Sequence, residues 1–414
     1  MKKKILIVGN TPKAYALAKK LSEKHDIYIT PSSDTLKEFT TCLDIREDNI
    51  NELLEFVMEN EIDMTIAASD IAIKSDIASK FSGNNQPVFA PSANASELIY
   101  NKTYAKKTLY KLRVPTPKFG IFEKLNLAND YMKNQKFPLV LKTNDNNSAT
   151  IVTSLNVAKN IAESVFAQKN QKLIIEDYVY GMPFSFYAIT DGYKALPIGS
   201  SLTYKHALEG NGGQLTSGMG ACSPNYKLSI DNEYFLMDNV IYPTLDSLEI
   251  AENPYLGILG VNGILTEEGQ ISVLGWQSFT QDFDTDAILN SIEDDLYTLF
   301  ESCIIGSFSD EVSNININNN QSVSLVLTCK NKESKENSIS GIDNIDDNTM
   351  ISFYPSVIKN KYLEYEAQYG NVIVLTSTAS SLSKAKTKVY EDASDINYDG
   401  IFYRKDISKI NNLS

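Results

Sequence analysis

The sequence predicts an α/β protein with a doubly wound parallel sheet at the N-terminus, a central mixed-sheet region and a small α+β region at the C-terminus. Short apolar strands alternate with helical segments over the first hundred residues, which is typical of a parallel sheet. Sequential strands joined by short turns follow, and these favour an antiparallel or mixed sheet. A polar low-complexity run, NININNN at 314–320, suggests a linker. We therefore predict domains at 1–100, 101–310 and 321–414.

The first predicted domain begins with the apolar run ILIVG and a helix that Pro12 is suited to start. Strands are expected at 5–9, 27–30, 62–69 and 86–92, with helices at 14–24 and 51–60. The segment 95–112, ASELIYNKTYAKKTLYKL, is expected to form one helix that leads to the proline-marked exit VPTP.

The central region is richer in strands. Strands are expected at 137–144, 172–179, 183–190 and 195–204, with helices at 156–168, 234–251 and 286–305. Residues 255–276 predict a hairpin whose turn is EEGQ. Between the strand expected at 195–204 and the helix expected at 234–251, residues 204–224 are expected to form a long flexible glycine-rich loop. In the third region, strands are expected at 322–329, 349–357, 371–378 and 400–407, with a helix at 379–391.

Composition narrows the class of partner. The net charge of −14 disfavours a nucleic acid or an anionic membrane as the main partner, and no apolar run approaches a membrane span. Four widely separated cysteines and two histidines disfavour a disulfide framework or a zinc site, and favour a reducing cytoplasm. The expected partner is a small-molecule nucleotide or metabolite; the sequence identifies no protein partner.

Five segments, in the same order along the chain, resemble the phosphoribosylamine–glycine ligase family of the ATP-grasp superfamily. They are 88–120, 173–181 (LIIEDYVYG), 203–224 (TYKHALEGNGGQLTSGMGACSP), 370–390 and 400–407 (GIFYRKDI). The resemblance implies an ATP-grasp fold with ATP and Mg²⁺ as cofactors. In that family ATP phosphorylates the carboxylate of glycine, and the amine of phosphoribosylamine then displaces phosphate.

The resemblance also implies nucleotide-binding positions. Lys102 and Lys142 stand where ATP-grasp proteins contact the α- and β-phosphates, although each alone could be an ordinary solvated lysine. Glu176, Asp177 and Val179 stand at the hinge that contacts adenine. A later hinge carboxylate of the family is replaced by Pro183, which weakens the expectation of ribose recognition. In the glycine-rich segment, Lys205 is the candidate catalytic residue.

The phosphate loop departs from the family pattern. The family has glycines and a second lysine after the strand that ends in Lys142, whereas this chain has TNDNNSATIV. Asp145 would repel a phosphate there. Asn146, Asn147 and Ser148 could donate hydrogen bonds in place of backbone amides, but a plain polar turn is the favoured interpretation.

The metal position departs as well. The family's Glu and Asn are replaced by Gly275 and Gln277, so a carboxylate ligand is missing. The candidate ligands that remain are Gln277, Asp282 and Asp284. Together with Asp286, these two aspartates are favoured as caps of the following helix over metal ligation.

The side that would bind the amine substrate has also lost charged groups. Lys13 is the basic residue left where the family has Gly-Gly-Arg-Glu-His, and Asp70 is expected either to keep a carboxylate role or to cap a helix. Thr203 replaces an Asp of the family and His206 replaces an Arg.

These departures predict a relative with a degenerate catalytic site that binds a nucleotide or has a regulatory role. One alternative is an active glycine-joining ligase with a rearranged magnesium site. Another is an ATP-grasp enzyme with a different amine or acid. Both alternatives still need magnesium and ATP, and several charge-stabilising groups are missing together.

Overall fold

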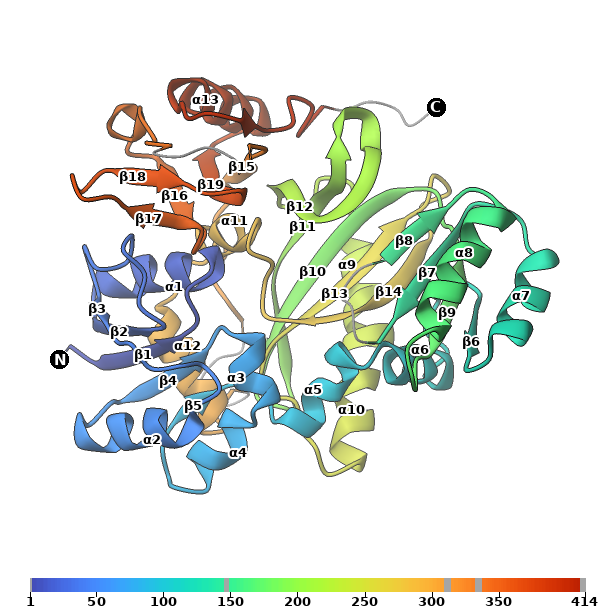
Figure 1. Ribbon diagram of the computed structural model, residues 1–414. Helices are drawn as coiled ribbons and strands as arrows, with labels where there is room; N and C mark the ends of the chain where they lie inside the picture. Colours follow the sequence, from blue (N-terminus) through green and yellow to red (C-terminus); the bar gives the residue numbers. More distant parts are fainter. Residues whose placement is uncertain (1, 145–148, 309–313, 332–336, 410–414) are drawn as a thin grey trace.

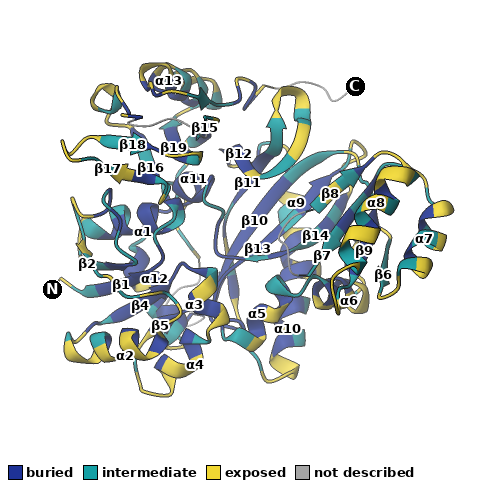
Figure 2. Ribbon diagram, in the orientation of Figure 1, coloured by how far each residue is buried: buried dark blue, intermediate teal, exposed yellow. Residues whose placement is uncertain are grey.

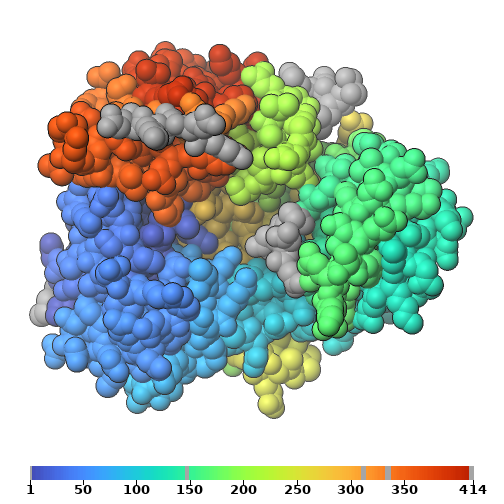
Figure 3. Space-filling model, viewed as in Figure 1, coloured from blue at the N-terminus to red at the C-terminus, as the bar shows by residue number. Residues whose placement is uncertain are grey.

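The computed structural model describes residues 2–144, 149–308, 314–331 and 337–409. Two large sheets and one smaller sheet organise these residues (Figure 1). The N-terminal segment and the last strands lie on one side of the molecule, and residues 119–177 form a separate lobe on the other side (Figure 3). The predicted phosphate-loop residues 145–148 lie outside the described residues.

The N-terminal domain is the predicted doubly wound parallel sheet. Its strands, in spatial order, are β3 (Thr41–Cys42), β2 (Asp26–Thr30), β1 (Lys4–Val8), β4 (Met64–Ala67) and β5 (Val88–Phe89). Its helices are α1 (Pro12–Ser22), α2 (Ile50–Glu59), α3 (Asp70–Lys74) and α4 (Ile77–Ser82). The sequence analysis did not identify β3, α3 and α4, because they are too short to show a clear period.

The predicted single helix at 95–112 is wrong, because two helices meet at Asn101. They are α5 (Ala93–Tyr100) and α6 (Lys102–Lys111). Asn101 is extended, with φ −104° and ψ 93°, and its Oδ1 accepts a hydrogen bond from Tyr104 N at 3.1 Å. Asparagine is a preferred N-cap, so its local preference outweighs the continuous apolar pattern.

A small antiparallel sheet forms the lobe. Its strands are ordered β6 (Phe119–Phe122), β9 (Leu173–Asp177), β7 (Leu139–Thr143) and β8 (Ala149–Val152). Helices α7 (Leu125–Lys133) and α8 (Leu155–Phe166) pack on one face and bury a separate apolar core with the sheet. Figure 2 shows their outward faces as exposed. This packing places β7 and β9 side by side, which brings two candidate site residues together.

The large antiparallel sheet spans the predicted boundary at 310–321. Its main strands are β14 (Ile271–Ser278), β13 (Gly257–Leu265), β10 (Met182–Thr190), β11 (Ala195–Leu208), β12 (Gly212–Ser223), β15 (Gln321–Cys329), β19 (Gly370–Ala379) and β16 (Thr349–Phe353). β20 (Ile401–Phe402) pairs with β15. The C-terminal strands therefore continue the central sheet, and Ile317 of the expected linker forms a bridge with Ile292.

The segment 204–224 was predicted to be a flexible loop, and that prediction is wrong. β11 and β12 form a hairpin through a short 3-10 turn, Glu209–Asn211. Gly210 and Asn211 adopt left-handed φ values of 64° and 56° in this turn. The glycines therefore permit the turn and irregular strand register instead of a mobile loop.

The predicted helix at 286–305 is also wrong as one element. It divides into α11 (Thr285–Leu289) and α12 (Leu296–Ile304), and Asp295 Oδ1 accepts from Thr298 N at 3.1 Å to cap the second. The predicted hairpin at 255–276 is confirmed by β13 and β14.

The remaining elements complete the described structure. They are α9 (Ile230–Leu236), a π-helical segment (Met237–Ile241), α10 (Tyr242–Ile250), a 3-10 turn (Ile342–Asn344), β17 (Val357–Lys359), β18 (Tyr365–Ala367) and α13 (Leu382–Asp395). Among the residues that the structure describes, no helix is both long enough and apolar enough to cross a bilayer.

Candidate functional site

Two predicted site residues meet at the centre of the small sheet. Lys142 extends from β7 and Glu176 from the neighbouring strand β9, on the same face. Lys142 Nζ lies 2.9 Å from Glu176 Oε2. On the other side of the carboxylate, Lys106 Nζ of α6 lies 3.2 Å from Oε1 and donates to Thr116 Oγ1 at 2.9 Å. The Glu176 and Lys106 side chains are 1% and 3% exposed, so this is a buried ion-pair cluster.

The cluster carries more positive than negative charge. Lys102 lies one helical turn before Lys106 on α6, and both interact electrostatically with Lys142 and Glu176. Burial, and then repulsion from Lys142, lower the pKa of Lys102 to about 8. Burial lowers the pKa of Lys106 to about 8, against the attraction of Glu176. Although burial alone would raise the pKa of Glu176, the lysines hold it below its ordinary value. Among the residues that the structure describes, one carboxylate thus faces three lysine ammonium groups, which favours an added anion.

Lys205 belongs to the same electrostatic region. It lies on β11 and is partly buried. Burial lowers the pKa of its ammonium group to about 8; Asp284 opposes the shift, and Lys142 adds to it. The structure therefore brings Lys142 within electrostatic range of both Lys102 and Lys205, although the three residues lie far apart in the sequence.

The predicted hinge residues separate into two environments. The Glu176 carboxylate is held by the two lysines, as described above. Asp177 and Val179 instead line a cavity of about 430 Å³, together with Tyr178, Lys118 and Glu267. The Asp177 backbone amide donates to Lys118 O at 2.9 Å, which fixes the start of the hinge.

The position expected for a metal is surrounded by neutral amides. Gly275 and Gln277 on β14 face Asn262 and Gly260 on β13. Gln277 Oε1 accepts from Asn262 Nδ2 at 2.7 Å and also from Gln281 Nε2. Gln277 Nε2 donates to the Tyr187 hydroxyl at 2.8 Å. The side-chain polar atoms of Gln277 are thus satisfied by other side chains.

The aspartates that follow are held elsewhere. Asp284 is fully buried, and its Oδ2 accepts from Tyr187 at 2.7 Å and from Ser201 at 2.6 Å. Asp282 Oδ1 accepts from Thr11 Oγ1 at 2.7 Å, at the start of α1. Asp286 accepts from Ser352 at 2.7 Å. The prediction that these aspartates cap the next helix is confirmed in position only: Asp284 is the N-cap residue of α11 and Asp286 lies in its first turn, but the Asp284 side chain makes no capping bond.

These residues do not fit a magnesium ion. Magnesium prefers carboxylate oxygens in tight octahedral geometry. Gly275 offers no side chain, Gln277 offers an amide, and the Asp284 oxygens already accept internal hydrogen bonds. Within the described ranges, no group of three or more His, Cys, Asp or Glu side chains could hold a metal ion.

On the side expected to bind the amine, the structure excludes one of the two roles predicted for Asp70, that of a helix cap. Ser69, and not Asp70, caps α3, because Ser69 Oγ accepts from Ile71 N at 3.1 Å. Asp70 instead accepts from the Tyr100 hydroxyl at 3.0 Å. The Lys13 backbone amide donates to Asp282 at 3.2 Å, so a carboxylate of the chain itself occupies the start of α1.

The two replaced positions of the glycine-rich segment lie on β11. Thr203 is buried, and its hydroxyl has no hydrogen-bond partner among the described residues. His206 Nδ1 lies 3.2 Å from Gly213 O across the hairpin.

The sequence analysis missed Lys106 and the polar side chains around Gln277. Lys106 could have been found from its spacing, because residues i and i+4 share one helix face and Lys102 was already a candidate. Tyr187, Asn262 and Ser201 carried no usable signal, since only strand pairing places them together.

Asp284 gives a prediction about pH. Burial raises the pKa of its carboxyl to about 6, despite the hydrogen bonds from Ser201 and Tyr187. An unfolded Asp loses its proton near pH 4, so between about pH 4 and 6 the folded state holds a proton that the unfolded state has lost. This group's contribution to stability is therefore lost as pH rises through that window, by about 3 kcal/mol.

The Asp284→Asn variant has no such proton. In urea denaturation, its free energy of unfolding should increase relative to that of wild type by about 3 kcal/mol from pH 4 to pH 7, because wild type loses stability over this range and the variant does not. Parallel pH profiles for the two proteins would contradict the assignment.

Comparisons with known proteins agree on one family. The family model "Phosphoribosylglycinamide synthetase, ATP-grasp (A) domain" matches residues 100–285, and the model of the N domain matches residues 3–98. A phosphoribosylamine–glycine ligase of Halalkalibacterium halodurans is 26% identical over 423 residues, covering 97% of this chain and 96% of the relative. One from Clostridium acetobutylicum is 26% identical over 420 residues, covering 98% and 99%.

Solved structures show the same fold. The crystal structure of phosphoribosylamine–glycine ligase from Thermotoga maritima has a TM-score of 0.81 at 18% identity, covering 98% of this chain and 100% of that one. A biotin carboxylase complex from Campylobacter jejuni has a TM-score of 0.72 at 14% identity, covering 97% and 93%. Both the recognition of the family and the predicted fold class are confirmed. The chain belongs to the phosphoribosylamine–glycine ligase family of the ATP-grasp superfamily.

Proposed function

We propose that this protein binds the phosphates of a nucleotide through its lysine cluster, without a magnesium ion held by the protein and without ligase turnover. The observation that carries the proposal is the contrast between two parts of one site. Lys102, Lys142 and Lys205 form an electropositive region, whereas at the expected metal position Gln277 is bonded to the neutral side chains of Asn262, Gln281 and Tyr187. Such a site retains attraction for an anion but has lost the acidic ligands that hold magnesium.

The expected loss of turnover follows from transition-state electrostatics. Phosphoryl transfer depends on metal ions and cations that neutralise charge developing on the transferred group. Removing one such stabilising group typically lowers the rate by about 10²–10³. Gly275 and Gln277 stand in place of the Glu and Asn that the family has at the metal position. We therefore expect this protein to bind the nucleotide but not to catalyse the ligase reaction.

The test is isothermal titration calorimetry of the full chain with ATP, in excess magnesium and in EDTA. We expect saturable binding below about 1 mM ATP, a range typical of enzyme substrates. The affinity in EDTA should equal or exceed that in magnesium, because the free nucleotide carries more negative charge. Absence of heat under both conditions, confirmed by absence of thermal stabilisation by ATP, would refute the proposal.

A second measurement separates the proposal from an active ligase. The protein is incubated with magnesium-ATP, glycine and freshly formed phosphoribosylamine, and ADP release is followed. We expect no release above the rate with ATP alone. Release that requires both glycine and the amine would establish the alternative, a ligase with a rearranged metal site.

Proton uptake gives a further prediction for the lysine cluster. Lys102, Lys106 and Lys205 are partly deprotonated near pH 8, because the pKa of each is lowered to about 8. A bound triphosphate favours their charged forms, so protons should be taken up on binding at pH 8 and hardly at pH 6.5. Titrations in two buffers of different ionisation enthalpy measure this uptake. An equal proton uptake at both pH values would show that the nucleotide does not bind at the lysine cluster.

A further inference from the structure

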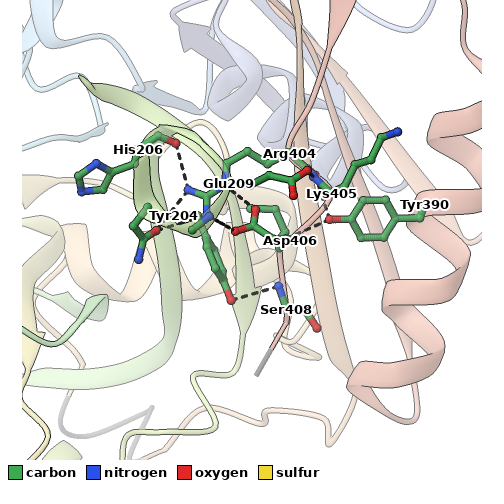
Figure 4. A network of polar contacts seen from close by, with 11 residues as sticks. Tyr204, His206, Glu209, Tyr390, Arg404, Lys405, Asp406 and Ser408 are labelled. Atoms are coloured by element: carbon green, nitrogen blue, oxygen red, sulfur yellow. Dashed lines mark hydrogen bonds and ion pairs between the residues drawn. The ribbon is translucent and has the colours of Figure 1, made fainter. Parts of the chain in front are cut away.

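The C-terminal segment 404–408 lies against the turn of the β11–β12 hairpin (Figure 4). Arg404 is among the largest fully buried side chains, with 1% exposure. Its guanidinium group makes two parallel bonds to Asp406, from Nε to Oδ1 at 2.8 Å and from Nη2 to Oδ2 at 2.7 Å. A buried bidentate pair of this kind has a fixed geometry.

The pair also holds the backbone of the hairpin. Arg404 Nη1 donates to His206 O at 3.0 Å, and Asp406 Oδ2 accepts from Gly210 N at 2.8 Å. The Asn211 side chain accepts from Nη1 and Nη2 at 3.3 Å each. Although burial alone would raise the pKa of Asp406, the Arg404 bonds and the Gly210 amide hold it below its ordinary value.

Neighbouring residues extend the contact in both directions. Ser408 N donates to the Tyr204 hydroxyl at 3.1 Å, and Lys405 N donates to Glu209 at 3.2 Å. On α13, the Tyr390 hydroxyl donates to Arg404 O at 2.9 Å and accepts from Ile407 N at 3.1 Å. Figure 4 shows these groups gathered between the hairpin, the C-terminal segment and α13.

These contacts fall on both sides of Lys205. Tyr204 and His206 are its chain neighbours, and each is bonded to a different residue of segment 404–408. The register of β11 and β12 shifts between Tyr204 and His206, so strand pairing alone does not fix Lys205. The bonds to the Tyr204 hydroxyl and to His206 O supply fixed points on either side of it. A buried ion pair adds little net stability over an apolar replacement, but it can fix one geometry.

We propose that Arg404 and Asp406 are positioning residues that hold Lys205 at the anion site, so that the C-terminal segment is part of the nucleotide-binding machinery. This inference rests on the proposed function. It predicts that a change at Arg404 weakens nucleotide binding through Lys205.

The experiment is a double-mutant cycle with Arg404→Lys and Lys205→Met, measured by ATP titration. Lysine keeps the charge but cannot reproduce the bidentate fork or the bond to His206 O. We expect Arg404→Lys to weaken ATP affinity about tenfold, which is the scale of one charge-assisted hydrogen bond. In the Lys205→Met background the same change should have no further effect, because the group it positions is gone. Arg113→Lys, at an exposed arginine, is the matched control.

Hydrogen exchange supplies a readout that does not need a ligand. Arg404→Lys should increase exchange in residues 203–215 and leave the small sheet unchanged; Asp406→Asn is a second variant in case the first folds poorly. Equal loss of affinity in both Lys205 backgrounds, or unchanged exchange in the hairpin, would overturn the positioning role. If wild type itself binds no ATP, the proposed function fails, and the exchange measurement still tests whether Arg404 and Asp406 hold the β11–β12 hairpin.

Discussion

Replacing Glu176 with glutamine should lower the free energy of unfolding by about 3–5 kcal/mol, the cost typical of removing one partner of a buried ion pair. Lys106 would remain buried with a neutral amide in place of its counterion, and Lys142 would lose the same carboxylate. Part of the loss would be relieved by deprotonation of Lys106, whose pKa burial already lowers to about 8. Denaturation in urea at pH 7 measures the change, and at pH 9 the loss should be smaller.

Glu123→Gln is the matched control. Glu123 forms an ion pair with Lys172 at 2.8 Å, a separation close to that of the buried pair. The Glu123 side chain is 67% exposed and that of Lys172 is 39% exposed, so this substitution should leave the stability of the protein within error of wild type. Equal effects of the two substitutions would show that burial of Glu176 does not control its contribution.

The second large effect is expected at the anion site. Lys205→Met removes one ammonium group but keeps an apolar side chain of similar length, and it should weaken ATP binding about 10–100-fold. Lys205 is a better target than Lys142, because loss of Lys142 would also leave Glu176 with one fewer partner. The same calorimetric titration used for wild type measures the change.

The matched control for that variant is Lys227→Met. Lys227 is exposed and follows β12, the other strand of the hairpin, so a general loss of positive charge would affect both variants alike. We expect Lys227→Met to bind ATP like wild type. Wild-type affinity in Lys205→Met would remove this residue from the site and leave the lysines of α6 and β7 to act alone.

The fold of the chain matches that of the family, and neutral side chains surround Gln277. Sequence similarity extends over 98% of the chain to relatives named phosphoribosylamine–glycine ligase, and the fold matches over the same length. At the positions expected for metal ligands, however, neutral side chains surround Gln277, and Asp282 accepts a hydrogen bond at the start of α1. The proposed binding role accounts for both observations, since phosphate attraction requires lysines that the fold brings together.

Some of this could be predicted from the sequence alone. Apolar runs determined the strands of the parallel sheet and the β13–β14 hairpin, because the period of buried residues is a local property. The apolar pattern wrongly predicted one helix at 95–112 and one at 286–305. In each range a second helix begins at its own N-cap residue, Asn101 or Asp295, although the apolar pattern is continuous. The sequence also identified Lys102, Lys142 and Lys205 as separate candidates.

Only the tertiary structure determined which of these candidate residues lie close together and which partners they contact. Lys106 enters the cluster because α6 packs beside β9, and Glu176 turns toward the lysines because β7 and β9 are neighbours. Asp284 becomes a buried acceptor of two hydroxyls because strands β10 and β11 meet the turn before α11. Tyr187 and Asp284 are nearly a hundred positions apart in the sequence. Local pattern determines secondary structure, whereas burial and pairing of charges depend on which distant elements pack together.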